Sequence, residues 1–301
     1  MRAVVAPPEA AVPQVAEVPD PAPGPGEVLI RVGAASVNPA DLAVVSGAVR
    51  EAFGLSGTVG LGWDAAGTVE ALGDGVEDLH VGDRVAGIDA APPAPTRAQA
   101  ELIALDRSAV ARIPEGLGLL EAGTVPLNVL TADAALDALE QAAGPAAGRR
   151  LLITGAAGAV GGYALDLARE RGWEVDGLAR PSDAEFVERT GARLVGSIEP
   201  GAYVGVLDAA NLHDDALAAL GAGGVLVGLT GPWRESTPEG VTAVFANTST
   251  DGDRLGELLE RSLTEAFAPR IAQVLDLEDA AQAYRTAQES GSRGRVVLRI
   301  G

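Results

Sequence analysis

The residues whose spacing first suggests chemistry are the glycines of GAAGAVGG, residues 155–162. The apolar run RRLLIT precedes them and the amphipathic segment YALDLARERG follows, so the pattern predicts a buried parallel strand, a tight turn and a helix. Backbone N–H groups of such a turn and the N-terminus of the helix after it bind diphosphates. We expect Gly158 to let the pyrophosphate approach the backbone and Gly161 to let the helix pack closely on the strand. Ala156 stands at the first glycine of the G-x-G-x-x-G pattern.

The end of the next expected strand, 173–179, indicates which dinucleotide would bind. An NAD site usually has an Asp or Glu there for the ribose 2′-OH. This chain has Arg180 and Ser182, which favour a 2′-phosphate and therefore NADPH. Asp176 lies mid-strand, too early for the ribose, and we expect Asp183 to cap the following helix. The alternative is that Arg180 is simply a solvated surface arginine.

Composition excludes several other chemistries. The 301 residues contain no cysteine, and every one of the 22 basic residues is arginine. Disulfides, thiolate metal sites, Schiff-base enzymes and Walker-type phosphate loops are therefore excluded. The net charge of −20 disfavours binding to nucleic acid or anionic membranes. No long apolar run or signal-peptide pattern is present, so we expect neither a membrane span nor a leader, and a cytoplasmic location.

The chain changes texture along its length. Short strand-like runs at 2–6, 27–37, 65–72, 83–88 and 98–105 are separated by turn material, with one short helical pattern at 41–49. From residue 119 the pattern becomes helical over 119–144, and strands and helices then alternate, which predicts a parallel sheet with helices on both faces. A helix over 277–291 and a strand over 294–300 close the chain. The expected fold class is α/β: a Rossmann doubly wound parallel sheet plus a β-rich domain.

The chain resembles the zinc-independent quinone oxidoreductase branch of the medium-chain dehydrogenase/reductase superfamily. The resemblance rests on EVPDPAPGPGEVLIRVGAASVNPADLAVVSG, GLGWDAAGTVEALGDGVEDLHVGDRVAG, AGTVPLNVLTADAAL, GAAGAVGGYALDLARERG and RGRVVLRI, in this order. It implies a GroES-like substrate domain over 1–118, completed by 265–301, and a Rossmann domain over 119–264. It also implies NADPH-dependent hydride transfer to a small electron-poor acceptor, commonly in a homodimer.

Zinc alcohol dehydrogenases of this superfamily hold a catalytic metal with the Cys of C-x-x-D and the His of G-H-E. In this chain Asn38 stands in the Cys slot and Trp63 in the His slot, with Asp41 and Asp64 beside them. An amide and an indole do not serve as zinc ligands, so we expect no metal site.

Three residues are candidates for direct roles in reduction. Asn38 could donate its amide to the acceptor, Thr131 could place a hydroxyl near the nicotinamide, and Trp63 could form an apolar or stacking wall. The alternatives are that Asn38 caps the turn before Pro39, Thr131 is a helix-interior hydroxyl and Trp63 is core. The expected dinucleotide contacts, implied by the turn and the resemblance, are Thr131, Gly155, Ala157, Gly158, Ala159, Val160, Gly161, Arg180, Ser182, Asn211, Leu229 and Phe245.

Some features of the branch are missing. No tyrosine follows the N-P-x-D motif, and Tyr163 lies within an expected helix, where packing explains it better than acid catalysis. His80 and His213 are expected to be solvated loop residues. The alternative for His213 is a place near the cofactor edge, because its loop follows a parallel strand at the carboxyl end. The pocket for the acceptor would be shaped by loops at about 46–60 and 90–96.

The sequence thus favours a zinc-independent NADPH-dependent reductase of quinones or α,β-unsaturated carbonyls. Two alternatives stay open: a dedicated enoyl or ketone reductase of a biosynthetic pathway, and a non-catalytic NADPH-binding sensor or structural protein. A metal-dependent alcohol dehydrogenase is disfavoured by Asn38 and Trp63.

Overall fold

The computed structural model describes residues 1–8, 12–51, 54–90, 94–229, 237, 239–289 and 293–301. Parts of both expected acceptor loops, and the end of the expected helix over 277–291, lie outside these residues. The chain folds into two compact units. The first comprises Met1–Leu127, Thr250–Leu263 and Ala268–Gly301, and the second comprises Asn128–Ser249 and Thr264–Phe267.

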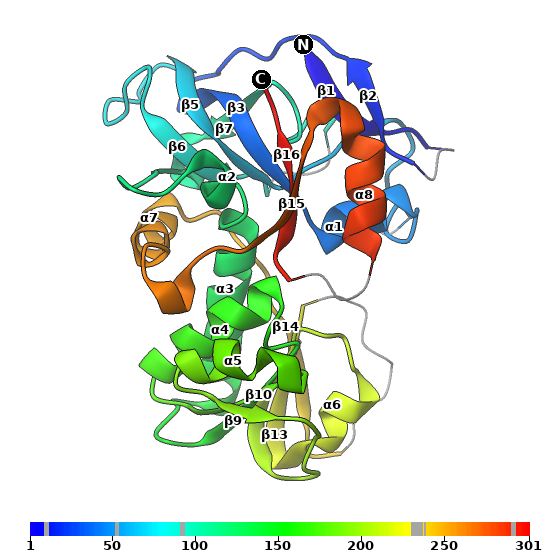
Figure 1. The fold of residues 1–301 in the computed structure, drawn as a ribbon, viewed down its shortest axis with the longest axis vertical. Coiled ribbons are helices and arrows are strands. Elements are labelled where there is room, and N and C mark those ends of the chain that lie inside the picture. The colour runs from blue at the N-terminus through cyan, green and yellow to red at the C-terminus, as the bar shows by residue number, and fades with distance from the viewer. Residues whose placement is uncertain (9–11, 52–53, 91–93, 230–236, 238, 290–292) are drawn as a thin grey trace. The chain divides into compact units, whose positions relative to one another are not determined.

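The strands of the first unit form two sheets (Figure 1). The larger sheet has the order β15-β16-β3-β5-β6-β8, with β7 also paired to β3, and the smaller has the order β2-β1-β4. The elements of this unit are β1 (Arg2–Ala6), β2 (Gln14–Glu17), β3 (Glu27–Val37), α1 (Pro39–Val45), β4 (Val59–Gly60), β5 (Asp64–Leu72), β6 (Arg84–Ile88), β7 (Leu102–Asp106), β8 (Val110–Arg112), α2 (Leu119–Ala122), α7 (Gly252–Arg261), β15 (Ile271–Asp276), α8 (Ala280–Gln288) and β16 (Arg295–Arg299), with 3-10 turns at Arg107–Ala109 and Leu277–Asp279.

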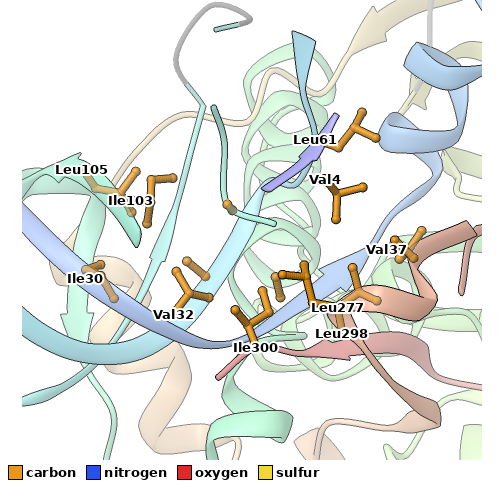
Figure 2. Packing of buried hydrophobic residues seen from close by; sticks show 14 of the residues in the cluster. Val4, Ile30, Val32, Val37, Leu61, Ile103, Leu105, Leu277, Leu298 and Ile300 are labelled. Atoms are coloured by element: carbon orange, nitrogen blue, oxygen red, sulfur yellow. The ribbon is translucent and has the colours of Figure 1, made fainter. Parts of the chain in front are cut away.

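Strand β3 is the centre of this unit because it pairs with β16, β5 and β7. Its inward side chains, such as Ile30 and Val32, join a buried cluster that draws on segments far apart in the sequence. Figure 2 shows part of this cluster, with Val4 and Leu298 from the two ends of the chain. Removing so much aliphatic surface from water is the main stabilising contribution to this unit.

The second unit contains one six-stranded sheet in the order β11-β10-β9-β12-β13-β14. All of its strand pairs are parallel. Numbered within the sheet, this is the order 3-2-1-4-5-6 of the Rossmann fold. Its elements are α3 (Pro126–Ala143, which starts at the end of the first unit), β9 (Arg150–Thr154), α4 (Ala159–Glu170), β10 (Glu174–Leu178), α5 (Ala184–Arg189), β11 (Arg193–Val195), β12 (Tyr203–Asp208), α6 (Asp214–Ala218), β13 (Leu220–Gly228) and β14 (Thr242–Phe245), with 3-10 turns at Pro181–Asp183 and Glu265–Phe267.

Helices cover both faces of this sheet. A Cβ built on Gly205 would contact Leu139 of α3, and one on Gly177 would contact Leu165 of α4. The neighbouring Val206 lies in the opposite cluster with Ala216 of α6. Because adjacent strand residues point to opposite faces, α3 and α4 cover one face and α6 covers the other. The expected fold class is confirmed.

Several local expectations need correction. The single helix expected over 119–144 is two helices, α2 and α3, because the chain turns at Gly123 and restarts at Pro126, whose missing N–H is tolerated at a helix start. Sequence reasoning also missed β15 and α7. Helix α7 belongs to the first unit and packs against β8, where a Cβ on Gly252 would lie 2.6 Å from the carbonyl oxygen of Val110.

Candidate functional site

The glycine turn in the second unit has the geometry of a phosphate-binding turn. Strand β9 ends at Thr154, Gly155 adopts a left-handed φ of 58°, and α4 begins after its N-cap residue, Gly158. A Cβ on Gly161 would lie 2.3 Å from the carbonyl oxygen of Gly155, so only glycine fits there. The turn therefore packs against the first turn of α4, and the N-terminal N–H groups and positive dipole end of a helix favour an anion.

The strand order places this turn at the switch point of the sheet. Chain connections leave β9 and β12 in opposite directions, and Rossmann sheets bind their ligands at the carboxyl ends of two such strands. The residues that end them are hydrogen-bonded to each other, since Thr154 Oγ1 donates to Asp208 Oδ1 at 2.6 Å. Sequence reasoning missed this pair, although an aspartate at the end of an apolar parallel strand is a usable signal.

Arg180 lies two residues beyond the end of β10, at the same edge of the sheet. Its side chain is 57% exposed, and its Nε lies 3.8 Å from Oδ2 of Asp183. Ser182 is exposed beside it. Asp183 precedes α5 as expected, but the carboxylate accepts the amide of Arg180 at 3.3 Å instead of capping that helix. The turn Pro181–Asp183 thus fixes the backbone from which the guanidinium extends.

Asp176 has a structural role within the second unit. It lies mid-strand in β10 and binds Arg150, Arg193 and the hydroxyl of Tyr203. Despite its burial, these donors lower the pKa of Asp176 below its ordinary value. The carboxylate is therefore held by a buried network, away from the carboxyl end of the strand.

Other expected cofactor contacts also reach the carboxyl edge of the sheet. Leu229 follows β13 and Phe245 is the last residue of β14, with 43% of its surface exposed. Thr131 lies in α3, where its hydroxyl is 2.8 Å from that of Thr248. Tyr163 is buried in α4, and its ring centroid lies 4.7 Å from that of Phe267.

The first unit holds a buried polar cluster around Asn38 and Asp64, both of which are fully buried. The Asn38 amide donates to Asp64 Oδ2 at 2.7 Å and to Ser36 Oγ at 2.9 Å. The Ser36 hydroxyl donates to the same carboxylate at 2.5 Å. Asp64 Oδ1 accepts the amide of Leu127, at the start of α3, at 2.5 Å. The two hydrogens of the Asn38 amide are thus directed into the protein.

Asp41 is the second buried carboxylate of this cluster. It accepts the amide of Asn38 at 2.9 Å and that of Gly62 at 2.8 Å. Burial raises the pKa of Asp41 to about 7 although both hydrogen bonds oppose the shift. Burial also raises the pKa of Asp64 above its ordinary value. Both carboxyl groups lie in a low-dielectric environment that disfavours the charged form.

Trp63 is partly buried next to an internal ion pair. The guanidinium of Arg97 lies 4.2 Å from the centroid of the indole, and its Nε donates to Asp89 Oδ2 at 2.9 Å. Both members of this ion pair are buried. The indole Nε1 is buried too, and within the described residues it has no hydrogen-bond partner. Sequence reasoning missed Arg97, which belongs to no quoted motif, and Ser36, which lies within a segment of the resemblance but has no role implied by it.

These residues do not fit a catalytic zinc ion. The two slots that would supply ligands hold an amide committed to Asp64 and an indole, and neither group binds zinc. Among the described residues, no three His, Cys, Asp or Glu side chains are grouped as a metal site requires. No helix in the described part of the chain is long and apolar enough to span a membrane.

Known proteins resemble the chain along most of its length. Residues 24–125 match the family described as alcohol dehydrogenase GroES-like domain, and residues 182–298 match that described as zinc-binding dehydrogenase. The chain is 30% identical to a quinone oxidoreductase of Sus scrofa, over 92% of this chain and 90% of that protein. It is 32% identical to an NADPH-dependent alkenal/one oxidoreductase of Arabidopsis thaliana, over 90% of this chain and 72% of that protein.

Parts of much larger proteins are similar as well. The polyketide synthase GfsB of Streptomyces halstedii is 31% identical over 91% of this chain, which spans only 5% of that protein. The chain spans 7% and 4% of two further polyketide synthases. Among solved structures, the quinone oxidoreductase from Coxiella burnetii has a TM-score of 0.84 and covers 100% of this chain and 99% of its own, at 23% identity. The similarity to the Coxiella burnetii structure shows the fold of this chain and nothing further.

Proposed function

Because the chain belongs to the medium-chain dehydrogenase/reductase superfamily, in its quinone oxidoreductase branch, we propose that it is a zinc-free, NADPH-dependent reductase. The proposed acceptor is a quinone or an α,β-unsaturated carbonyl compound. Membership of the family makes the chain an oxidoreductase. The choice of NADPH, the class of acceptor and the independence from zinc are what we propose.

The observation that carries the preference for NADPH is the position of Arg180. An exposed guanidinium at the carboxyl end of β10 stands where a Rossmann sheet meets the ribose of the adenosine half. A phosphate there would receive a charge-assisted hydrogen bond. Asp183 is buried and already accepts the amide of Arg180, so it is poorly placed to accept a ribose hydroxyl.

The described residues supply binding and orientation. Bound NADPH would supply the hydride, and a proton from water would complete a two-electron reduction. The turn between Gly155 and Gly161 would hold the diphosphate with backbone N–H groups. In the pair of hydroxyls formed by Thr131 and Thr248, one proton joins the two oxygens, which leaves the other available to a bound group. We assign Asn38 to holding Asp64, because its amide hydrogens are directed to Asp64 and Ser36.

A second candidate function is supported by the similarity to polyketide synthases. The match to GfsB covers 91% of this chain, and an enoyl thioester is an α,β-unsaturated carbonyl compound like the enones. A dedicated enoyl reductase would therefore use the same cofactor site with a different acceptor. Fold alone does not distinguish the two.

The experiment is a titration of the purified protein with NADPH and NADH, followed by oxidation of the bound cofactor. The acceptors are 9,10-phenanthrenequinone, a simple enone and a 2-enoyl thioester. Tighter binding of NADPH with quinone or enone turnover supports the proposal, whereas turnover of the thioester alone favours the second candidate. Binding without turnover of any acceptor favours a non-catalytic sensor, and absence of binding to either cofactor overturns the interpretation of the glycine turn.

Two further parts of the proposal concern the protein's surroundings. We propose that the chain acts in the cytoplasm on small molecules and forms a homodimer, as is common in this branch. Sedimentation velocity at several concentrations measures the second point, and a monomer at all of them would refute it.

A further inference from the structure

A buried clamp joins the ends of β9 and β12 in the second unit. Asp208 and Thr154 are both fully buried. Asp208 Oδ1 accepts the Thr154 hydroxyl at 2.6 Å and the amide of Leu212 at 3.1 Å, and Oδ2 accepts the amide of His213 at 2.9 Å. The oxygen of the same hydroxyl accepts the amide of Ala210 at 3.0 Å. Two side chains thus bind three backbone amides of the loop formed by residues 209–213.

This loop contains two non-glycine residues with left-handed backbone. Asn211 has a φ of 54°, which asparagine tolerates. His213 has φ 52° and ψ −103°, a region that residues with a Cβ seldom occupy. A conformation of this kind persists only where its surroundings enforce it, and it is frequent at ligand sites. The amide of His213 is one of the groups held by Asp208, so the clamp enforces the unusual conformation.

The loop lies directly against the glycine turn. A Cβ built on Gly155 would be 3.2 Å from the backbone carbon of Ala209 and 3.2 Å from the Cβ of Ala210. Both loops leave the carboxyl ends of neighbouring parallel strands at the switch point of the sheet. The clamp therefore fixes one side of the crevice in which a Rossmann sheet binds its ligand.

We propose that Thr154 and Asp208 are positioning residues for the dinucleotide, and that the strained loop 209–213 is held rigid as one wall of its site. This inference rests on the proposed function. The wall lies beside β12, whereas Arg180 follows β10, on the other side of β9 in the sheet order. Loosening the loop therefore weakens the binding of NADPH and of NADH by the same factor. A change at Arg180, by contrast, would weaken the binding of NADPH alone.

The first test compares Thr154→Val with Thr154→Ser, which differ in the hydroxyl that completes the clamp. The wild-type protein is titrated first with both cofactors, and binding of neither refutes the proposed function before any variant is made. The valine variant is expected to raise both dissociation constants by about tenfold, and the serine variant to restore both to within about twofold. Titrations are made at a temperature at which circular dichroism shows every variant folded. A lower melting temperature with both dissociation constants unchanged would make the clamp merely structural and overturn the inference.

The second test relaxes the strained residue directly. His213→Gly is expected to raise the melting temperature, because glycine adopts this backbone freely. The same variant is expected to bind both cofactors more weakly. Ala147→Gly is the matched control: Ala147 has a φ of 46° in the turn before β9, at the opposite end of that strand, so only stability should change. His213→Ala keeps the strain and removes the imidazole, so it should bind more tightly than His213→Gly. Equal cofactor binding by the two glycine variants, or a loss confined to NADPH, contradicts the inference.

Discussion

Replacing Arg180 by alanine is the sharpest test of cofactor choice. The guanidinium is 57% exposed, and its Nε lies 3.8 Å from Oδ2 of Asp183. A hydrogen bond between charged groups contributes about 1.5–3 kcal/mol, so the NADPH dissociation constant should rise about 10- to 150-fold. NADH has no 2′-phosphate, so by the same reasoning its dissociation constant should rise by no more than about twofold.

The assay is a fluorescence titration of wild type and variant with both cofactors at low and high salt. Because the site is exposed, added salt should reduce the wild type's preference for NADPH over NADH. The same salt should leave the cofactor preference of the variant nearly unchanged. Arg189→Ala is the matched control, since it removes one positive charge from the end of α5, where Arg189 pairs with Glu185. Equal losses for NADPH and NADH would show that Arg180 supports the fold of the turn, and no loss for NADPH would place the phosphate elsewhere.

Two further predictions concern the glycine turn and the buried acid. Gly161→Ala would place a Cβ 2.3 Å from the oxygen of Gly155. It should cost about 1–3 kcal/mol of folding free energy and weaken the binding of both cofactors. The control Gly196→Ala, with no atom within 4 Å of its Cβ, should have the melting temperature of the wild type. Burial raises the pKa of Asp41 from 3.8 to about 7, so its contribution to stability is complete below about pH 4 and is lost as the pH rises to about 7. The free energy of unfolding of the wild type relative to that of Asp41→Asn, measured in urea, should therefore fall by at most about 4 kcal/mol between those pH values. If this difference in unfolding free energy did not change with pH, the acid would stay ionised in the folded protein.

The sequence was informative where one local pattern determines one local structure. A buried strand, a glycine turn and an amphipathic helix must pack closely, and the structure shows why Gly161 has no substitute. The parallel sheet with helices on both faces was expected from the alternation of strands and helices, whereas the order of its strands came from the structure. Strand β3 was likewise predicted to its exact residues from a long apolar run bounded by turns.

The missed features depend on contacts between distant segments. Asp208 and Thr154 are separated by 54 positions and meet only because β9 and β12 are neighbours in the sheet. Arg97 reaches Trp63 through a similar long-range contact. The side-chain partner of Asp183 was predicted incorrectly because a 3-10 turn intervenes between β10 and α5, and that turn presents the amide of Arg180 instead. Periodicity carries no information about such pairings.

The buried cluster around Asp64 explains why one substitution would not create a zinc site. A buried carboxylate needs either a cation or enough hydrogen-bond donors, and Asp64 has donors from Ser36, Asn38 and Leu127. Asn38→Cys would supply a thiol but remove one of these donors, and Trp63 would still occupy the second ligand position with an indole. The carboxylate would then lose a partner before any metal could replace it. A metal site would require simultaneous changes at positions 38 and 63, with the stability of the protein measured in the presence and absence of zinc.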